Sequence, residues 1–242
     1  MSGNQANRGA GVFVNMNSSA ILSNVRLVDH HTDPDAEFGG GLYAHLSDVT
    51  LSNVVVGRNH AAYGAGLYLL DANAIIHNSI FGKNKADGNG GAIAVEGGSV
   101  ATLTNVTLAN NNAYGSGGGV YVLNSSATLT NCSMWWNDTG TSPGFHAVTP
   151  ILASISYSNV DDPVIGPVTM SNIISHNRGL LLTWANYPDW DLHFASTFPF
   201  VDAGNPSILD PDGSRSDIGV YGGPGADDWD LDGDRYSEWW EP

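Results

Sequence analysis

The sequence predicts an all-β protein, a single-stranded right-handed parallel β-helix (a solenoid) with an irregular C-terminal cap. Three signals recur along the chain: a Gly-rich stretch before a short apolar strand, an Asn after a second short strand, and a polar turn residue. They share one drifting period of about 25 to 30 residues, which is typical of repeat architectures. Each repeat is expected to form one turn that buries little alone and gains its core by stacking.

The Gly-rich signal opens the first strand of each repeat. It reads Gly-Ala-Gly-Val-Phe-Val at residues 9–14 and Gly-Gly-Gly-Val-Tyr-Val at residues 117–122. Related copies begin at Gly39, Gly64 and Gly90. Glycine adopts the positive φ angles of sharp corners at little cost, so these stretches predict corners that are followed by strands.

Polar residues mark two further positions of the repeat. The Asn after the second strand occurs at Asn24, Asn53, Asn78, Asn105, Asn131 and Asn159. The turn position holds Asn4, His30, Asn59, Asn84, Asn111 and Asn137. Because Asn in a repeating corner can hydrogen-bond its equivalents in the adjacent turns, as in amide ladders, we interpret the Asn columns as structural rather than as ligand sites.

The second strand alternates apolar and polar side chains with period two. The predicted inward columns are Leu22, Leu51, Ile76, Leu103 and Leu129, and Leu27, Val56, Phe81, Leu108 and Met134. The single cysteine, Cys132, aligns with core positions and is expected to be an inert packing residue. A leucine-rich repeat, the main alternative fold, needs a helical segment in each repeat, and residues 5–160 show no helical period.

These repeats resemble the right-handed β-helix repeat family, which includes polymorphic outer-membrane adhesins and many secreted bacterial β-helix proteins. Gly-Gly-Gly-Val-Tyr at residues 117–121 and Leu-Thr-Asn at residues 129–131 carry the resemblance. Residues 200–206 and 210–224 resemble the closing segment of secreted members. The resemblance implies a cap over the exposed strand edge of the last turn. It also implies export to the cell surface or outside, and no particular chemistry.

The chain is expected to have three parts: β-helix repeats at residues 1–184, a capping segment at residues 185–226 and an acidic tail at residues 227–242. The first residues read as the end of a repeat whose beginning is missing, so we expect a longer natural N-terminus. The net charge is −16 with only eight Lys and Arg residues. Nucleic acid and anionic membrane surfaces would be repelled, so neither is an expected partner.

The acidic tail predicts a calcium site, because carboxylates recur there with the spacing of a twelve-residue calcium loop. The expected ligands, in loop order, are Asp230, Asp232, Asp234, Tyr236 through its carbonyl, Glu238 and Glu241. Arg235 departs from the pattern, since it stands where the loop turn prefers glycine. A disordered acidic linker without bound metal is the alternative interpretation.

An aromatic column follows the corner glycines on the outward side of the first strands. It consists of Phe13, Tyr43, Tyr68 and Tyr121 and is broken by Ala94. Rings stacked on one face could hold sugar rings, so this column is the candidate glycan-binding site. The alternative is that the rings shield the sheet and pair across turns.

No catalytic residue can be named from the sequence. β-Helix lyases that this fold resembles use a basic residue to take a proton from an acidic sugar, and Arg58 and Lys83 align one turn apart. No aspartate cluster surrounds that pair in the repeat. Glycoside hydrolysis needs two carboxylates that face one cleft, whereas Asp48, Asp71 and Glu96 fall at different places in their turns.

We therefore expect an exported, non-catalytic β-helix, on the cell surface or secreted, that adheres to polysaccharide or cell-surface glycans. A polysaccharide lyase or glycosidase is the alternative from a different class. A rigid spacer within a larger surface protein is a third interpretation. Calcium is the one cofactor that the sequence predicts.

The calcium loop can be tested directly. The double substitution Asp230→Ala and Asp232→Ala is expected to abolish calcium binding by the tail, because two hard oxygen ligands are lost. Titration calorimetry with Ca²⁺ measures this, and circular dichroism is expected to show unchanged turns. The control, Asp189→Ala with Asp191→Ala, removes equal charge outside the loop. Calcium affinity that persists in the first double variant would show the assignment to be wrong.

Overall fold

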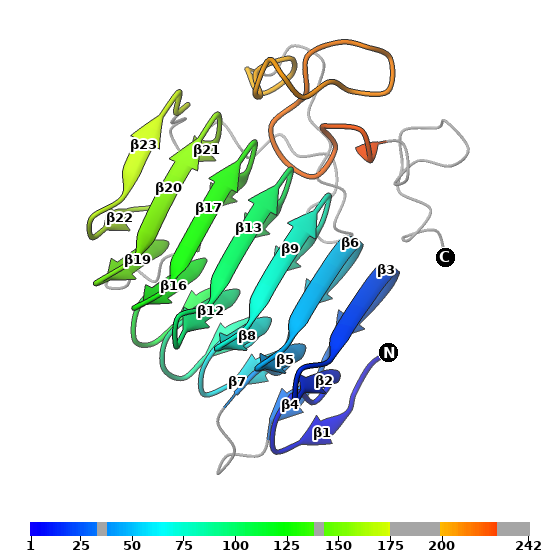
Figure 1. Ribbon diagram of the computed structural model, residues 1–242, viewed down its shortest axis with the longest axis vertical. Helices are drawn as coiled ribbons and strands as arrows, with labels where there is room; N and C mark the ends of the chain where they lie inside the picture. Colours follow the sequence, from blue (N-terminus) through cyan, green and yellow to red (C-terminus); the bar gives the residue numbers. More distant parts are fainter. Residues whose placement is uncertain (33–37, 138–142, 175–198, 227–242) are drawn as a thin grey trace.

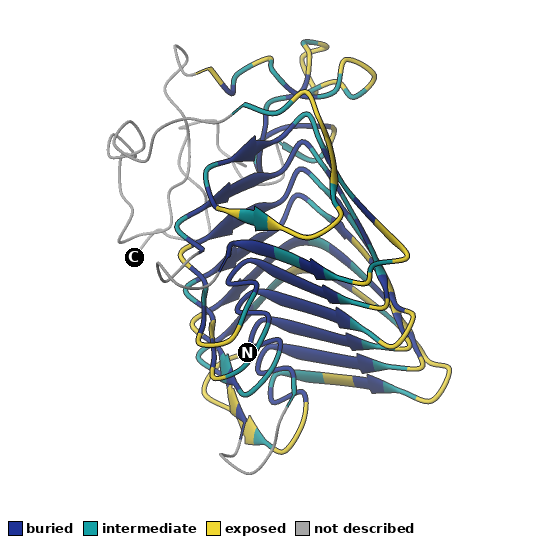
Figure 2. Cartoon of the chain, turned by 90° about the vertical axis from the view of Figure 1, so that its left-hand side faces the viewer, coloured by how far each residue is buried: buried dark blue, intermediate teal, exposed yellow. Residues whose placement is uncertain are grey.

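Figure 1 shows the computed structural model, which describes residues 1–32, 38–137, 143–174 and 199–226. The described residues contain no α-helix, and their strands pair in parallel to form a β-solenoid of about 6 turns. The predicted solenoid is therefore confirmed. Three sheets form its walls, and Figure 2 shows buried strands of successive turns lying one above another.

The seven-stranded sheet contains the strands that follow the Gly-rich signals. In stacking order it comprises β2 (Val12–Asn15), β5 (Leu42–His45), β8 (Leu67–Leu70), β12 (Ile93–Glu96), β16 (Val120–Leu123), β19 (Phe145–Val148) and β22 (Val164–Ile165). The five-stranded sheet is made of two-residue strands, namely β1 (Gln5–Ala6), β4 (His31–Thr32), β7 (His60–Ala61), β11 (Lys85–Ala86) and β15 (Asn112–Ala113).

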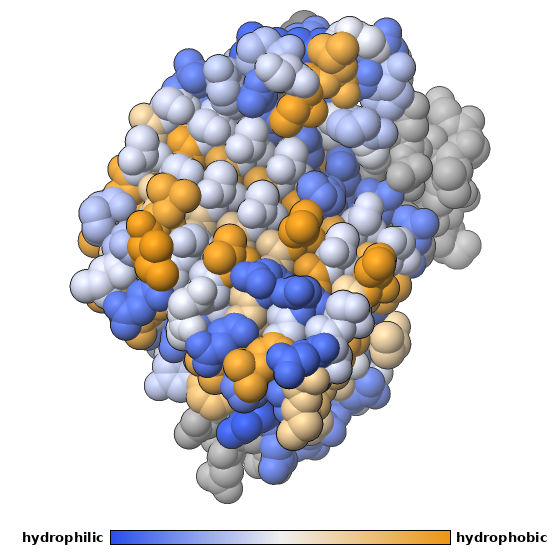
Figure 3. Space-filling model, viewed as in Figure 1, coloured by the Kyte–Doolittle hydropathy of each residue, from blue (hydrophilic) through white to orange (hydrophobic). Residues whose placement is uncertain are grey.

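The eleven-stranded sheet contains the alternating strands. Two long strands open it, β3 (Ser19–Val28) and β6 (Asp48–Gly57). Later turns divide the same path into two strands: β9 (Asn73–His77) and β10 (Ile80–Gly82), β13 (Val100–Thr104) and β14 (Thr107–Ala109), β17 (Ser126–Thr130) and β18 (Ser133–Trp135), and β20 (Leu152–Ser156) and β21 (Asn159–Val160). β23 (Thr169–Ser171) pairs with β20 at the end of the stack. Figure 3 shows apolar residues scattered over the face that is turned to the viewer, without one continuous apolar patch.

The predicted inward columns form the core. Leu51, Ile76 and Leu103 pair in register on β6, β9 and β13, and all three are buried. The second column pairs in the same way from Leu27 to Met134 and is also buried. Cys132 lies fully buried in the same cluster, where burial raises the pKa of its thiol to about 12. Its predicted place in the core is confirmed.

Left-handed corners allow the chain to close each turn. The Asn column from Asn24 to Asn131 has φ between 41° and 55°. The corner glycines from Gly9 to Gly117 have φ between 55° and 72°. A Cβ at Gly39 would lie 2.5 Å from the carbonyl oxygen of Leu42, so this corner also needs glycine for space. Asn is the non-glycine residue that accepts left-handed backbone most readily, which explains the repeating Asn.

The predicted turn column is a buried amide ladder. Asn59, Asn84, Asn111 and Asn137 are all buried. The first three each donate from Nδ2 to the Oδ1 of the next Asn at 2.8–3.0 Å. Each Nδ2 also donates to a backbone carbonyl of the preceding turn. Each Oδ1 accepts a backbone N–H from the neighbouring turn. The structural interpretation of this column is confirmed, since a satisfied buried network specifies one arrangement.

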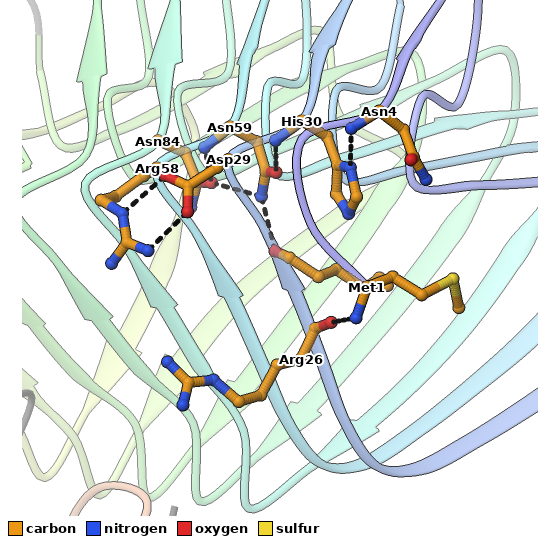
Figure 4. Close-up of polar contacts among 9 residues, drawn as sticks. Met1, Asn4, Arg26, Asp29, His30, Arg58, Asn59 and Asn84 are labelled. Carbon is orange, nitrogen blue, oxygen red and sulfur yellow. Dashed lines mark hydrogen bonds and ion pairs between the residues drawn. The ribbon is translucent and has the colours of Figure 1, made fainter. Parts of the chain in front are cut away.

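Different groups close the two ends of the ladder. At the N-terminal end, the backbone N–H of His30 donates to Oδ1 of Asn59 at 2.9 Å, and Nδ1 of His30 accepts the N–H of Asn4 at 3.2 Å (Figure 4). At the other end, the carboxylate of Asp162 accepts the backbone N–H of Asn137 at 3.1 Å and its Nδ2 at 2.7 Å. Because Asp162 is buried, water cannot accept these hydrogen bonds at the end of the ladder. The carboxylate of Asp162 accepts them in place of a further Asn side chain.

The C-terminal segment, residues 199–226, binds to the other Asn column. Nδ2 of Asn78 donates to the carbonyl oxygens of Val220 and Gly222 at 3.0 and 2.6 Å. Oδ1 of Asn131 accepts the N–H of Asn205 at 2.6 Å. Figure 1 shows this segment, in orange, beyond the carboxyl ends of β9, β13 and β17. The backbone of these asparagines therefore forms the left-handed corner, and their side chains bind the C-terminal segment.

The described part of this segment, residues 199–226, packs against the side of the turns. Phe200, Ile218 and Val220 pack against outward-facing residues of the eleven-stranded sheet, among them Val55 and Ile80. The described part of the segment thus covers the side of the turns, whereas all of β23 in the last turn is exposed. The outward face of the eleven-stranded sheet is apolar at these residues, and the segment removes this apolar surface from water. Residues 185–198 of the predicted cap and the predicted tail lie outside the described residues.

The end of the ladder generates a stability prediction. Asp162→Ala is expected to lower the free energy of unfolding by about 1–3 kcal/mol, because two buried N–H donors of Asn137 lose their acceptor. The control Asp162→Asn keeps a carbonyl acceptor and is expected to cost clearly less. Urea denaturation followed by circular dichroism measures both. Equal losses in the two variants would contradict the role of Asp162 as the ladder acceptor.

The docked segment is expected to loosen as the pH rises. Burial, with a smaller contribution from Asp210, raises the pKa of Asp217 from 3.8 to about 6. A carboxyl whose pKa is raised in the folded state stabilises that state when protonated, so this contribution is lost as the pH rises from about 4 to 6. Limited proteolysis within residues 199–226 is expected to accelerate over this range. In Asp217→Asn, which stays neutral, a slope as steep as that of the wild type would refute the assignment.

Candidate functional site

The aromatic column lies on the seven-stranded sheet in the predicted register. Phe13, Tyr43 and Tyr68 occupy paired positions on β2, β5 and β8. Their rings stack, with centroids 5.3 and 5.6 Å apart. Ala94 follows on β12 and Tyr121 on β16. The column therefore has one gap, at Ala94, between two tyrosines.

The rings of the column are far less exposed than an open platform would be. Phe13 is 50% exposed, but Tyr43, Tyr68 and Tyr121 are only 1%, 3% and 8% exposed. Phe38 contributes to this cover, since its ring centroid lies 4.6 Å from that of Tyr68. Glycan binding by the column stays a prediction, and the structure restricts it to the places where ring faces reach solvent.

Two aromatic residues that the sequence analysis missed complete this surface. Phe38 and Tyr63 each precede a corner glycine, they bridge to each other in parallel, and their rings stack at 5.7 Å. Their common place directly before Gly39 and Gly64 is the signal that could have found them. It was weak because the same position is Arg8 in the first repeat and Asn89 in the fourth.

A pocket of about 380 Å³ opens beside the gap in the column. Its aromatic lining consists of Phe38, Tyr63, Tyr68 and Tyr121. Asn89, Glu96 and Leu123 complete the lining. We call this the aromatic pocket. Tyr68 and Tyr121, which flank the buried Ala94 in the stack, both line this pocket.

Glu96 is the charged group of the aromatic pocket. Its Oε2 accepts a hydrogen bond from the hydroxyl of Tyr68 at 3.0 Å. Burial raises the pKa of Glu96 above its usual value, and this hydrogen bond opposes the rise. Burial and the nearby Glu96 carboxylate raise the pKa of the Tyr68 and Tyr121 hydroxyls. The tyrosines therefore stay neutral hydrogen-bond donors beside a half-buried carboxylate.

The composition of the lining favours binding. Small-molecule sites of roughly 300–1,000 Å³ are lined mainly by apolar and aromatic groups, with a few polar groups that fix orientation. A glycosidase needs a second carboxylate that faces the same cleft. Among the described residues that line the aromatic pocket, Glu96 is the only carboxylate.

The residues considered for lyase chemistry lie at another corner. Arg58 and Lys83 both occupy left-handed corners, with φ of 54° and 56°. The Arg58 guanidinium forms a two-point ion pair with Asp29, with nitrogen–oxygen distances of 2.7 and 2.6 Å (Figure 4). This pairing raises the pKa of Arg58, whereas a proton-abstracting base must lose its proton.

The structure does not test the predicted calcium loop, because residues 230–241 lie outside the described residues. Within the described residues, no group of three or more His, Cys, Asp or Glu side chains is arranged to hold a metal ion. Of the carboxylates considered for hydrolysis, Asp48 binds Asn73 on the eleven-stranded sheet, whereas Glu96 lies in the aromatic pocket.

Comparisons with known proteins return no match: no family model, no curated protein and no solved structure corresponds to this chain. Across the described ranges, no helix is long and apolar enough to cross a bilayer. The aromatic pocket is therefore interpreted from its own chemistry.

Proposed function

We propose that this chain is an exported, non-catalytic β-solenoid, on the cell surface or secreted, that binds polysaccharide or cell-surface glycans in the aromatic pocket. The observation that carries the proposal is the pocket between Tyr68 and Tyr121, in which four aromatic rings surround a small set of polar groups. The resemblance of the repeats to adhesins and secreted β-helix proteins supports the exported location.

The chemistry of sugars suits such a lining. A pyranose ring presents apolar C–H groups on its faces and hydroxyl groups at its edge, so it can contact aromatic faces and polar groups at once. In the aromatic pocket, Glu96 can accept hydroxyl hydrogen bonds and Asn89 can both donate and accept them. Tyr68 is fixed by its hydrogen bond to Glu96 and by packing against Phe38, so little ordering is needed on binding.

The proposal predicts how two substitutions change binding to soluble oligosaccharides. Ala94→Tyr is expected to fill the gap in the column and abolish binding. The backbone here resembles that at Tyr68, because a Cβ added to Gly90 would lie 2.6 Å from the Cβ of Ala94, much as one added to Gly64 would lie 2.8 Å from that of Tyr68. Tyr121→Ala is expected to weaken binding about tenfold through the loss of one ring contact. Titration calorimetry on a panel of neutral, acidic and amino oligosaccharides measures both.

The control for these variants is Tyr114→Ala, which removes an exposed tyrosine that follows β15 in the five-stranded sheet. This variant is expected to bind like the wild type. Binding that survives in Ala94→Tyr, or no binding to any oligosaccharide, would contradict the proposal. New reducing ends or unsaturated sugars in the same reactions would favour the lyase or glycosidase instead.

A further inference from the structure

We propose that the sugar unit held in the aromatic pocket carries a positive charge, namely the ammonium group of an amino sugar without its N-acetyl group. This inference rests on the proposed function and names the substrate class of the same site. It is carried by two features of the pocket, a carboxylate that has no ion-pair partner among the described residues and a set of ring faces that attract cations.

The first feature is the electrostatic state of Glu96. Carboxylates taken out of water are usually paired with a cation or fully hydrogen-bonded. The one hydrogen bond from a described residue goes to Oε2, from Tyr68, and no described residue forms an ion pair with Glu96. No lysine or arginine occurs in the described lining of the pocket. A ligand ammonium would supply both the missing charge and up to three donors for the carboxylate.

The second feature is the aromatic cluster itself. Aromatic faces attract cations through the ring quadrupole when the charge lies within about 6 Å of the centroid. At its N-terminal side this cluster already holds one, since the guanidinium carbon of Arg8 lies 5.7 Å from the centroid of Phe38 and 5.9 Å from that of Tyr43. Phe38 also lines the aromatic pocket, together with the rings of Tyr63, Tyr68 and Tyr121. The charged residue of that lining is Glu96, an anion that would attract a ligand cation.

Together these features discriminate between two forms of one sugar. A deacetylated amino sugar and its N-acetylated counterpart have the same ring and hydroxyl groups, but only the first has an amino group that can be protonated to an ammonium. Contacts with the C–H faces and hydroxyl groups are available to both, so the proposed function requires only that sugars bind. The further inference requires that the charged form bind more tightly, and that Glu96 be the reason.

The experiment compares β-1,4-linked glucosamine hexasaccharide, its N-acetylated form and cellohexaose by titration calorimetry on the full chain. An ionic strength near 0.15 M limits the general attraction of a cationic ligand to an acidic protein. Wild type is expected to bind the glucosamine form more tightly than the N-acetylated form, on the order of tenfold. Glu96→Gln, which keeps the acceptor for Tyr68, is expected to lose this preference and retain binding to both forms.

Asp48→Asn is the matched control, because it removes the same charge from an exposed residue of the eleven-stranded sheet. It is expected to keep the full preference. Equal affinity for the two glucosamine forms in wild type would overturn the inference and leave glycan binding standing. A preference that persists in Glu96→Gln would also overturn it, since general electrostatic attraction would then be the cause. No binding to any of the three ligands would overturn both proposals.

Discussion

Each turn of the solenoid has to bring the chain back to the same sheet, displaced by only one strand spacing along the axis. Left-handed corners make this possible. Parallel strands stack about 4.8 Å apart, which leaves no room for a wide loop at every corner. Asn105 and Gly117 turn the chain sharply because each adopts a positive φ that most residues avoid. Once the corners are fixed, the register between turns is fixed too. The core columns, the amide ladder and the aromatic column all depend on that register.

The corners also explain how far the sequence could predict the structure. The recurring corner residues align the repeats, and the period-two alternation of the strand then predicted the place of Leu103 in the core. The docking of the C-terminal segment could not be predicted in this way. Its contacts with Asn78 join residues up to 144 positions apart and depend on an apolar outer face that no local pattern reveals. Likewise, the place of Tyr68 in the aromatic column could be predicted from the sequence, but the burial of its ring beneath that of Phe38 could not.

The aromatic pocket lies where the otherwise regular column has its one departure, since Tyr68 and Tyr121, which flank Ala94, both line it. The backbone around Ala94 matches that around the aromatic positions of the neighbouring turns, with strand pairing unbroken from β8 through β12 to β16. Only the side chain differs, and the strand pairing of the neighbouring turns continues past Ala94. Residues placed on such a framework keep their positions without needing a ligand to order them. A stacked fold can therefore form a pocket from residues of neighbouring turns, here from Phe38 to Leu123, without a change in its strands.

The amide ladder has a consequence for the electrostatics of the whole stack. Its four side-chain amides are oriented alike: each donates one N–H toward the C-terminal end, and each carbonyl oxygen accepts from the N-terminal side. Their dipoles therefore add along the axis, as peptide dipoles do in a helix, with the positive end at Asn137. A buried anion is most stable at that end, and there the chain replaces asparagine with the carboxylate of Asp162. The solenoid thus has an electrical direction, and a single charged residue terminates it.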